Sequence, residues 1–267
     1  MSENRIRSGG NNVDWVRVRV LEVVQWRQNV GKERTIRHIM VALRNWLRYK
    51  FLPVKFNREG LGVTTICLTK EGHPEIHVEV DSATLIDDAE QFLRFVVAYI
   101  RHSGVTIKAG ESLQYGYWSV KFESRNDSVL EVWEYNQDAT AFVLGASLAV
   151  RYWHEQNCMC LAFHARFDPP VFSQATVISA GVIEGLPVEG VRYPWGERMS
   201  GWLLVTKEWD GRMESLQRHH TYHVTAARPE LAQYLALPRG FRFDLTQGER
   251  VWFDAEAAKE QYPPTED

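Results

Sequence analysis

A cluster of cysteine and histidine, Cys158, Cys160 and His164, could bind a metal ion. In a strand, all three side chains would point to one face, and two thiolates at positions i and i+2 could share a metal. His164, however, would lie about 13 Å beyond Cys160 along such a strand, too far to complete the same tetrahedron. Cys67 stands alone in another apolar stretch. We therefore expect 158–164 to be a central strand whose cysteines belong to the core.

A second cluster, His219-His220-x-x-His223, has the helical spacing of zinc-protease histidines. That motif also needs a glutamate between the histidines, and none is present. The sequence Thr-Tyr-His-Val around His223 favours a strand, which would hold His219 and His223 too far apart for one ion. We expect polar surface here and no metal site.

Other candidates for chemistry also lack the surroundings that their motifs need. Ser147 lies in a Gly-Ala-Ser-Leu-Ala sequence that resembles a nucleophile elbow, but we place it in the middle of a helix. Gly60-Leu-Gly62 lacks the lysine of a phosphate-binding loop. The grouped carboxylates are expected on solvated faces; they are Asp87, Asp88, Glu90, Glu131, Glu134 and Asp138. We therefore predict a non-enzymatic protein without a cofactor.

The elements that position these residues are mixed along the chain. The clearest helix has Thr84 and Asp87 at capping-box spacing, apolar residues from Leu85 to Ile100, and Gly104 as its C-terminal stop. Further helices are expected over 33–49, over 139–155 and from Pro229. Strands are expected over 16–20, 63–68, 75–80, 105–108, 114–122, 129–135, 158–164, 176–183, 201–206, 221–224, 241–245 and 251–253.

This order predicts an α+β protein of two α+β lobes, each with a mixed or antiparallel sheet and flanking helices. We expect a flexible tail over 1–12, an N-terminal domain over 13–165, a C-terminal domain over 175–258 and an acidic tail over 259–267. The paired prolines of Asp168-Pro-Pro indicate an exposed linker over 166–174, where proteases should cut.

Composition limits the function classes further. The net charge of −3 speaks against a general nucleic-acid binder, and the longest apolar runs are too short to span a membrane. Three cysteines in 267 residues, without an apolar leader, fit the reducing cytoplasm. Ten tryptophans raise the expectation of a protein-binding surface.

The last third of the chain carries a recognisable series of short motifs. A strand over 175–188 is followed by a loop that starts at Tyr193 and closes on Ser200-Gly201-Trp202. An acidic turn over 207–210, a Pro229-initiated helix and a Gly240-Phe241 strand complete the series. This order resembles the immunity protein 33 (Imm33-like) domain of bacterial proteins that neutralise polymorphic or contact-delivered toxins. The loop after Tyr193 and the turn at Asp210 carry fewer acids than that family's pattern.

The resemblance implies a cytoplasmic immunity protein that binds a cognate toxin and occludes its active site or substrate groove. A secreted nuclease effector, for example one delivered by type VI secretion, would present a basic groove to the acidic excess of residues 166–267. The protein itself would contact neither nucleic acid nor membrane. Two alternatives stay open: an adaptor or chaperone that loads an effector onto a secretion system, and an unrecognised hydrolase.

Toxin contact is expected at two loops of the C-terminal domain, because strand-connecting loops commonly carry function. The residues expected to bind the partner are Tyr193, Trp195, Glu197, Glu208, Trp209 and Asp210. Trp202 is excluded, because it begins an apolar strand and should fill the core.

Overall fold

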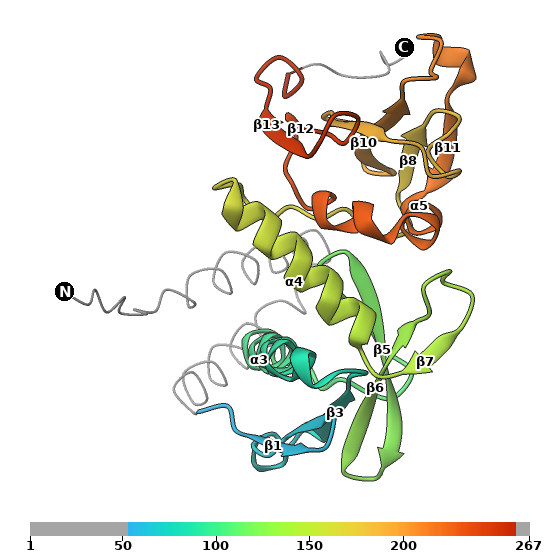
Figure 1. Cartoon of the computed structure of the whole chain (residues 1–267). Helices are drawn as coiled ribbons and strands as arrows, with labels where there is room; N and C mark the ends of the chain where they lie inside the picture. The colour runs from blue at the N-terminus through green and yellow to red at the C-terminus, as the bar shows by residue number, and fades with distance from the viewer. Residues whose placement is uncertain (1–52, 260–267) are drawn as a thin grey trace, which may run out of the picture.

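The computed structural model describes residues 53–259 and contains two mixed sheets with helices packed against them (Figure 1). The expected strand over 16–20, the expected helix over 33–49, the N-terminal tail and nearly all of the acidic tail lie outside these residues. The α+β class with two lobes is confirmed.

The N-terminal sheet has the order β1-β2-β3-β6-β5-β4, with β7 paired to β6. Its neighbours are antiparallel except for the parallel pair β3 and β6. The strands are β1 (Phe56–Glu59), β2 (Gly62–Thr65), β3 (Glu75–Glu79), β4 (Ser112–Tyr115), β5 (Trp118–Asn126), β6 (Val129–Tyr135) and β7 (Phe142–Leu144). Helices α3 (Ile86–Ser103) and α4 (Ser147–Ala162) pack against this lobe.

The C-terminal sheet has the order β11-β8-β10-β9-β12-β13, with β8 and β10 parallel and the other pairs antiparallel. The strands are β8 (Ala175–Ile178), β9 (Val188–Arg192), β10 (Met199–Thr206), β11 (Gln217–His220), β12 (Phe241–Asp244) and β13 (Arg250–Phe253). Helix α5 (Thr221–Ala227) and the 3-10 helix η5 (Pro229–Tyr234) follow β11. Pro229 begins η5, as the sequence predicts.

Helix α3 ends as expected but begins differently. Gly104 adopts a left-handed conformation (φ 64°), and its N–H bonds to the carbonyl of Ile100. At the start, a 3-10 turn over Ala83–Leu85 precedes the helix, and the Ser82 hydroxyl accepts the hydrogen bond from the Thr84 N–H. Ser82 is therefore the capping residue, and the proposed capping role of Thr84 is wrong.

The expected helix over 139–155 is confirmed only from Ser147 onward, and the expected strand over 158–164 is wrong. Phe142–Leu144 pair with β6, and α4 runs from Ser147 through both cysteines to Ala162. Gly145 separates the two elements at φ 101°, where a Cβ would lie 2.6 Å from the Glu79 carbonyl oxygen. The buried positions Tyr152, Gln156 and Cys160 recur every four residues, which is a helical period.

Three other strand predictions are corrected. Residues 105–108 form no strand, and residues 221–224 begin α5 instead. The predicted strand over 114–122 is a hairpin, β4 and β5, that turns at Gly116 with φ 60°.

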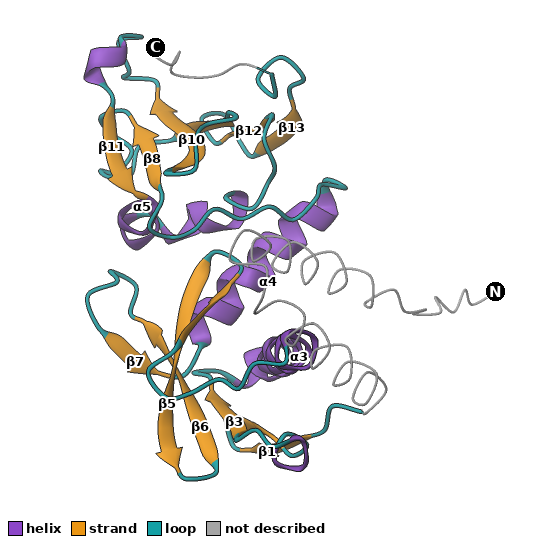
Figure 2. Ribbon diagram, turned by 180° about the vertical axis from the view of Figure 1, so that it is seen from behind, coloured by secondary structure: helices purple, strands orange, loops and turns teal. Residues whose placement is uncertain are grey.

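The two sheets lie on opposite sides of α4, which crosses the molecule between them (Figures 1 and 2). From α4, the Gln156 amide donates to the carbonyl of Ala232 (2.9 Å), and the Cys160 thiol donates to that of Ala236 (3.4 Å). One apolar core contains Phe92 and Trp118 from the first lobe together with Trp202 and Phe243 from the second. The lobes therefore share a continuous core.

The expected linker, 166–174, has no regular secondary structure, but it is packed between the lobes. Phe172 lies against Trp118, Tyr135 and Tyr222, with ring centroids 5.1–5.9 Å apart. Its backbone is also held: the Asp168 N–H donates to Ala236, and the Phe172 N–H donates to Tyr117. Because its apolar side chains and backbone groups are engaged, this segment is not an exposed hinge.

Candidate functional site

Strand β10 separates the two expected contact loops. The loop 193–198 joins β9 to β10, whereas the turn 207–210 follows the other end of β10. Eight residues of extended strand place the two loops roughly 25 Å apart. The structure therefore does not bring all six proposed residues into one site.

Tyr193 and Trp195 are buried, each with 9% exposure. They belong to a small second core on one face of the C-terminal sheet, together with Val177, Val191 and Leu203. Glu197, in the same loop, is exposed. Neither aromatic ring is therefore presented to solvent as a free anchor.

The motif Ser200-Gly201-Trp202 has a structural role. Gly201 adopts φ 87° within an irregular stretch of β10, and a Cβ there would lie 2.6 Å from the Tyr193 carbonyl oxygen. The Ser200 hydroxyl accepts from the Trp202 N–H (3.2 Å) and hydrogen-bonds the Thr176 hydroxyl (2.8 Å). Trp202 is fully buried, as expected, and its indole N–H donates to the Leu235 carbonyl.

The turn after β10 is ordered by its own side chains. The Trp209 indole N–H donates to the Arg212 carbonyl (3.0 Å) and the Ser215 hydroxyl (3.1 Å). Asp210 accepts from the Arg212 N–H and from the Ser215 hydroxyl, and the latter bond is the main cause that holds the pKa of Asp210 below its usual range. The turn thus holds a half-buried Trp209 beside the exposed Glu208.

A buried arginine that no sequence motif indicates connects the linker to the C-terminal sheet. Arg192 ends β9, and its guanidinium donates to the carbonyls of Ser200 (3.1 Å), Asp168 and Leu237 (2.6 Å). The Asp168 carboxylate lies 3.8 Å away. Burial lowers the pKa of Arg192 to about 10; Asp168 opposes this shift, whereas Arg239 and Arg166 add to it. Because β9 reads Val-Glu-Gly-Val-Arg and also contains the exposed Glu189, no local signal in the sequence distinguishes Arg192 as a buried charge.

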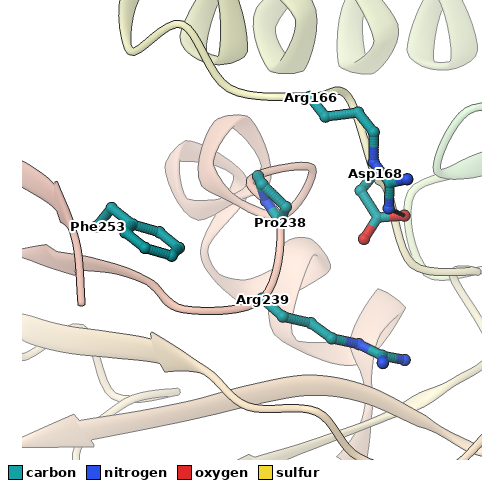
Figure 3. A pocket seen from close by; sticks show the side chains of 5 residues that line it. All are labelled: Arg166, Asp168, Pro238, Arg239 and Phe253. Carbon is teal, nitrogen blue, oxygen red and sulfur yellow. Dashed lines mark ion pairs between the residues drawn. The ribbon is translucent and has the colours of Figure 1, made fainter. Parts of the chain in front are cut away.

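Two neighbouring cavities lie at this junction, and Arg192 lines the smaller of them. The larger, of about 490 Å³, is lined by Arg166, Asp168, Pro238, Arg239 and Phe253 (Figure 3). The second, of about 210 Å³, shares Asp168 and Arg239 with the first. It reaches Arg192 and the three proposed contact residues of the loop, Tyr193, Trp195 and Glu197. These cavities are the candidate site at the junction of the linker and the C-terminal domain.

The expectation that both cysteines belong to the core holds for Cys160 and is wrong for Cys158. On α4, Cys158 is exposed and Cys160 is buried, so their side chains point in different directions. The Cys158 sulfur instead lies 3.6 Å from His154 Nε2, and His154 Nδ1 lies 2.9 Å from the Asp88 carboxylate. These three side chains line neither of the two cavities. Among residues 53–259, no group of three or more His, Cys, Asp or Glu side chains is arranged to hold a metal ion.

The second histidine cluster also differs from the prediction. His219 and His220 end β11, while His223 lies in α5, where a strand was expected. His220 and Tyr222 stack with centroids 5.5 Å apart, and Tyr222 contacts His223 at 4.2 Å. The rings thus pack on one another at the β11–α5 junction.

Comparison with known proteins identifies the C-terminal part of the chain. Residues 155–254 match the family model of the Imm33-like domain. The resemblance seen in the motifs is therefore confirmed for this part. The matched span includes all five residues that line the larger cavity. It also begins within α4, twenty residues before the expected domain start at 175. No curated protein and no solved structure matches the chain.

The Imm33-like domain places this part of the chain in an immunity-protein family. No helix within residues 53–259 is long and apolar enough to cross a bilayer.

Proposed function

We propose that this protein is a bacterial immunity protein that binds a cognate toxin one-to-one and blocks its active site or substrate groove. The match of residues 155–254 to the Imm33-like domain carries this proposal. A purely binding role requires no cofactor, and the toxin that we favour is a nuclease effector with a basic groove. We place the protein in the cytoplasm, where such a toxin would otherwise act.

The turn 207–215 supplies one part of the proposed contact surface. Its internal hydrogen bonds fix the Trp209 ring before binding, which lowers the entropy cost of using that ring at an interface. Glu208 and Glu214 are both exposed at this turn and offer negative charge to a basic groove. Tyr193 and Trp195 then act by shaping the loop that presents Glu197.

Binding rates measure the two contributions separately. Trp209→Ala is expected to raise the dissociation rate about thirtyfold, the equivalent of about 2 kcal/mol for a central aromatic contact. Glu208→Lys is expected to slow association and weaken its salt dependence, because peripheral charges mainly steer the encounter. Glu59→Lys, which makes the same charge change on exposed β1, is the matched control. If all three variants keep wild-type kinetics, the contact lies elsewhere.

The experiment that tests the function uses a toxin purified from the native strain by its association with this protein. An immunity protein abolishes the activity of the toxin at one equivalent. An adaptor or chaperone binds the toxin and leaves it active. A toxin that remains fully active in the stoichiometric complex overturns the immunity proposal in favour of that alternative.

A further inference from the structure

We propose that the cavity between Arg166, Arg239 and Phe253 is a carboxylate-binding pocket that accepts an acidic side chain of a polypeptide partner. An apolar neighbour of that acidic residue would pack on Phe253 and Pro238. The pocket carries positive charge, whereas in the C-terminal region as a whole acidic residues outnumber basic ones. It is also distinct from the turn 207–215.

The positive charge around the cavity is incompletely neutralised. Asp168 is shared between Arg166, at 3.7 Å, and Arg192, at 3.8 Å, so neither guanidinium has a close ion pair with it. Arg239 makes no ion pair with any carboxylate within residues 53–259. The exposed Glu197 reaches the rim of the smaller cavity and not the lining of the larger one.

Arg192 adds a buried charge behind these surface groups. Its hydrogen-bond acceptors are backbone carbonyls, which are neutral. A buried guanidinium without a close counter-ion is unfavourable, and an anion held nearby would reduce this cost. Asp168 is therefore the only carboxylate of the described residues that offsets the charges of Arg166 and Arg192, which favours an anionic ligand at this cavity.

The opposite wall of the cavity is apolar. The Phe253 side chain is 55% exposed at the end of β13. Figure 3 shows its ring across the cavity from the guanidinium groups of Arg166 and Arg239, with Pro238 between them. An exposed aromatic ring facing two cations favours a ligand with an apolar group beside its negative charge. A peptide carboxylate fits this pattern better than a nucleic-acid phosphate.

Size is consistent with this class of ligand. A volume of about 490 Å³ lies within the range of small-molecule sites and suits one or two side chains of a partner. The linker 166–168, the η5–β12 connection and β13 form its walls, so the pocket exists because the linker packs on the C-terminal sheet. The inference rests on the proposed function only in naming the toxin as the source of the acidic residue.

Pocket binding is tested first on the full chain without any toxin. The probe is the blocked dipeptide leucyl-glutamate amide, its neutral control is leucyl-glutamine amide, and inorganic phosphate is the third arm. Arginine Nε–H resonances report binding by NMR. We expect the glutamate peptide to shift the Arg239 and Arg166 signals in a saturable way and the glutamine peptide to leave them unchanged.

Variants identify the residue responsible. Arg239→Ala is expected to weaken glutamate-peptide binding about tenfold or more, because it removes a charge-assisted hydrogen bond. Arg239→Lys should retain part of the affinity for the glutamate peptide. Arg218→Ala, which removes the same charge from exposed β11 at the other edge of the sheet, should have no effect. Equal binding of both peptides, equal weakening by the two alanine variants, or binding of phosphate alone would each overturn the carboxylate pocket.

The purified toxin then tests the source of the carboxylate. We expect Arg239→Ala to weaken toxin binding about tenfold. Arg218→Ala is again the control and should leave toxin binding unchanged. If the dipeptide binds but Arg239→Ala leaves toxin affinity unchanged, the toxin is not the pocket's partner. If the wild-type chain fails to inhibit the toxin, the proposed function falls while the dipeptide result for the pocket stands.

Discussion

At the scale of single residues, Glu134 makes a contact that no local pattern reveals. It lies on β6, and its carboxylate accepts hydrogen bonds from the N–H groups of Leu148 (2.8 Å) and Ala149 (2.7 Å) in the first turn of α4. Burial nevertheless raises the pKa of Glu134 to about 7. The expected solvated position of Glu134 is wrong, because this residue is only 3% exposed.

The raised pKa of Glu134 makes stability depend on pH. The folded protein binds the Glu134 proton more tightly than the unfolded chain does. Protonated Glu134 therefore stabilises the fold fully below the pKa of the unfolded chain, and this stabilisation is lost as pH rises through about 7. We expect the free energy of unfolding to fall by about 3 kcal/mol at most between pH 4.5 and pH 8. Glu134→Gln should flatten this dependence, while Glu131→Gln on the same strand should retain it. Denaturant titrations at several pH values measure the free energy of unfolding for each variant. If this free energy depends on pH equally in both variants, Glu134 is not the group responsible.

The three cysteines differ in exposure, which predicts their order of reaction. Cys158 is exposed and contacts His154, Cys67 is partly buried, and Cys160 is buried. Burial also raises the pKa of the Cys67 thiol. We expect a neutral alkylating reagent to modify Cys158 first at neutral pH, because this thiol is the most accessible of the three. Peptide mass mapping over time measures the order, and earlier labelling of Cys67 would refute it.

Secondary-structure elements show where the sequence was informative. The apolar periodicity of α3, together with Gly104, predicted that helix closely, because both signals are local. The start of α4 was missed because Phe142–Leu144 owe their strand conformation to pairing with β6, a partner distant from their own segment. Likewise, the sequence places Trp195 among the residues expected to bind the partner, whereas long-range packing buries its ring. The cationic cavity was also missed, since Asp168, Arg239 and Phe253 meet only in the folded chain.

Gly145 provides a test of the strand-to-helix transition. Both Gly145 and Gly248 have positive φ, but an added Cβ would meet the Glu79 carbonyl at 2.6 Å only at Gly145. We expect Gly248→Ala to lower the free energy of unfolding by about 1 kcal/mol and Gly145→Ala to lower it by clearly more, because backbone strain and a clash then add. Equal effects on thermal or denaturant unfolding would show that the contact with Glu79 is unimportant.

At the scale of the whole molecule, the shared core links the lobes energetically. The Gln156 and Cys160 contacts of α4, and Phe172 of the linker, join elements on both sides. We therefore expect calorimetry of the full chain to show one cooperative transition, and limited proteolysis to spare 166–174. Two separate transitions, or a stable fragment ending near residue 170, would mean that the lobes are independent.

We propose that the chain neutralises a toxin, and the match of residues 155–254 to the Imm33-like domain supports this proposal. The most direct measurement is a titration of the purified cognate toxin with the purified protein, following the catalytic activity of the toxin. We expect a linear fall in toxin activity that reaches zero at one equivalent and is shifted to higher concentrations by Trp209→Ala but not by Glu59→Lys. A toxin that binds the protein yet retains full activity at saturation would contradict it.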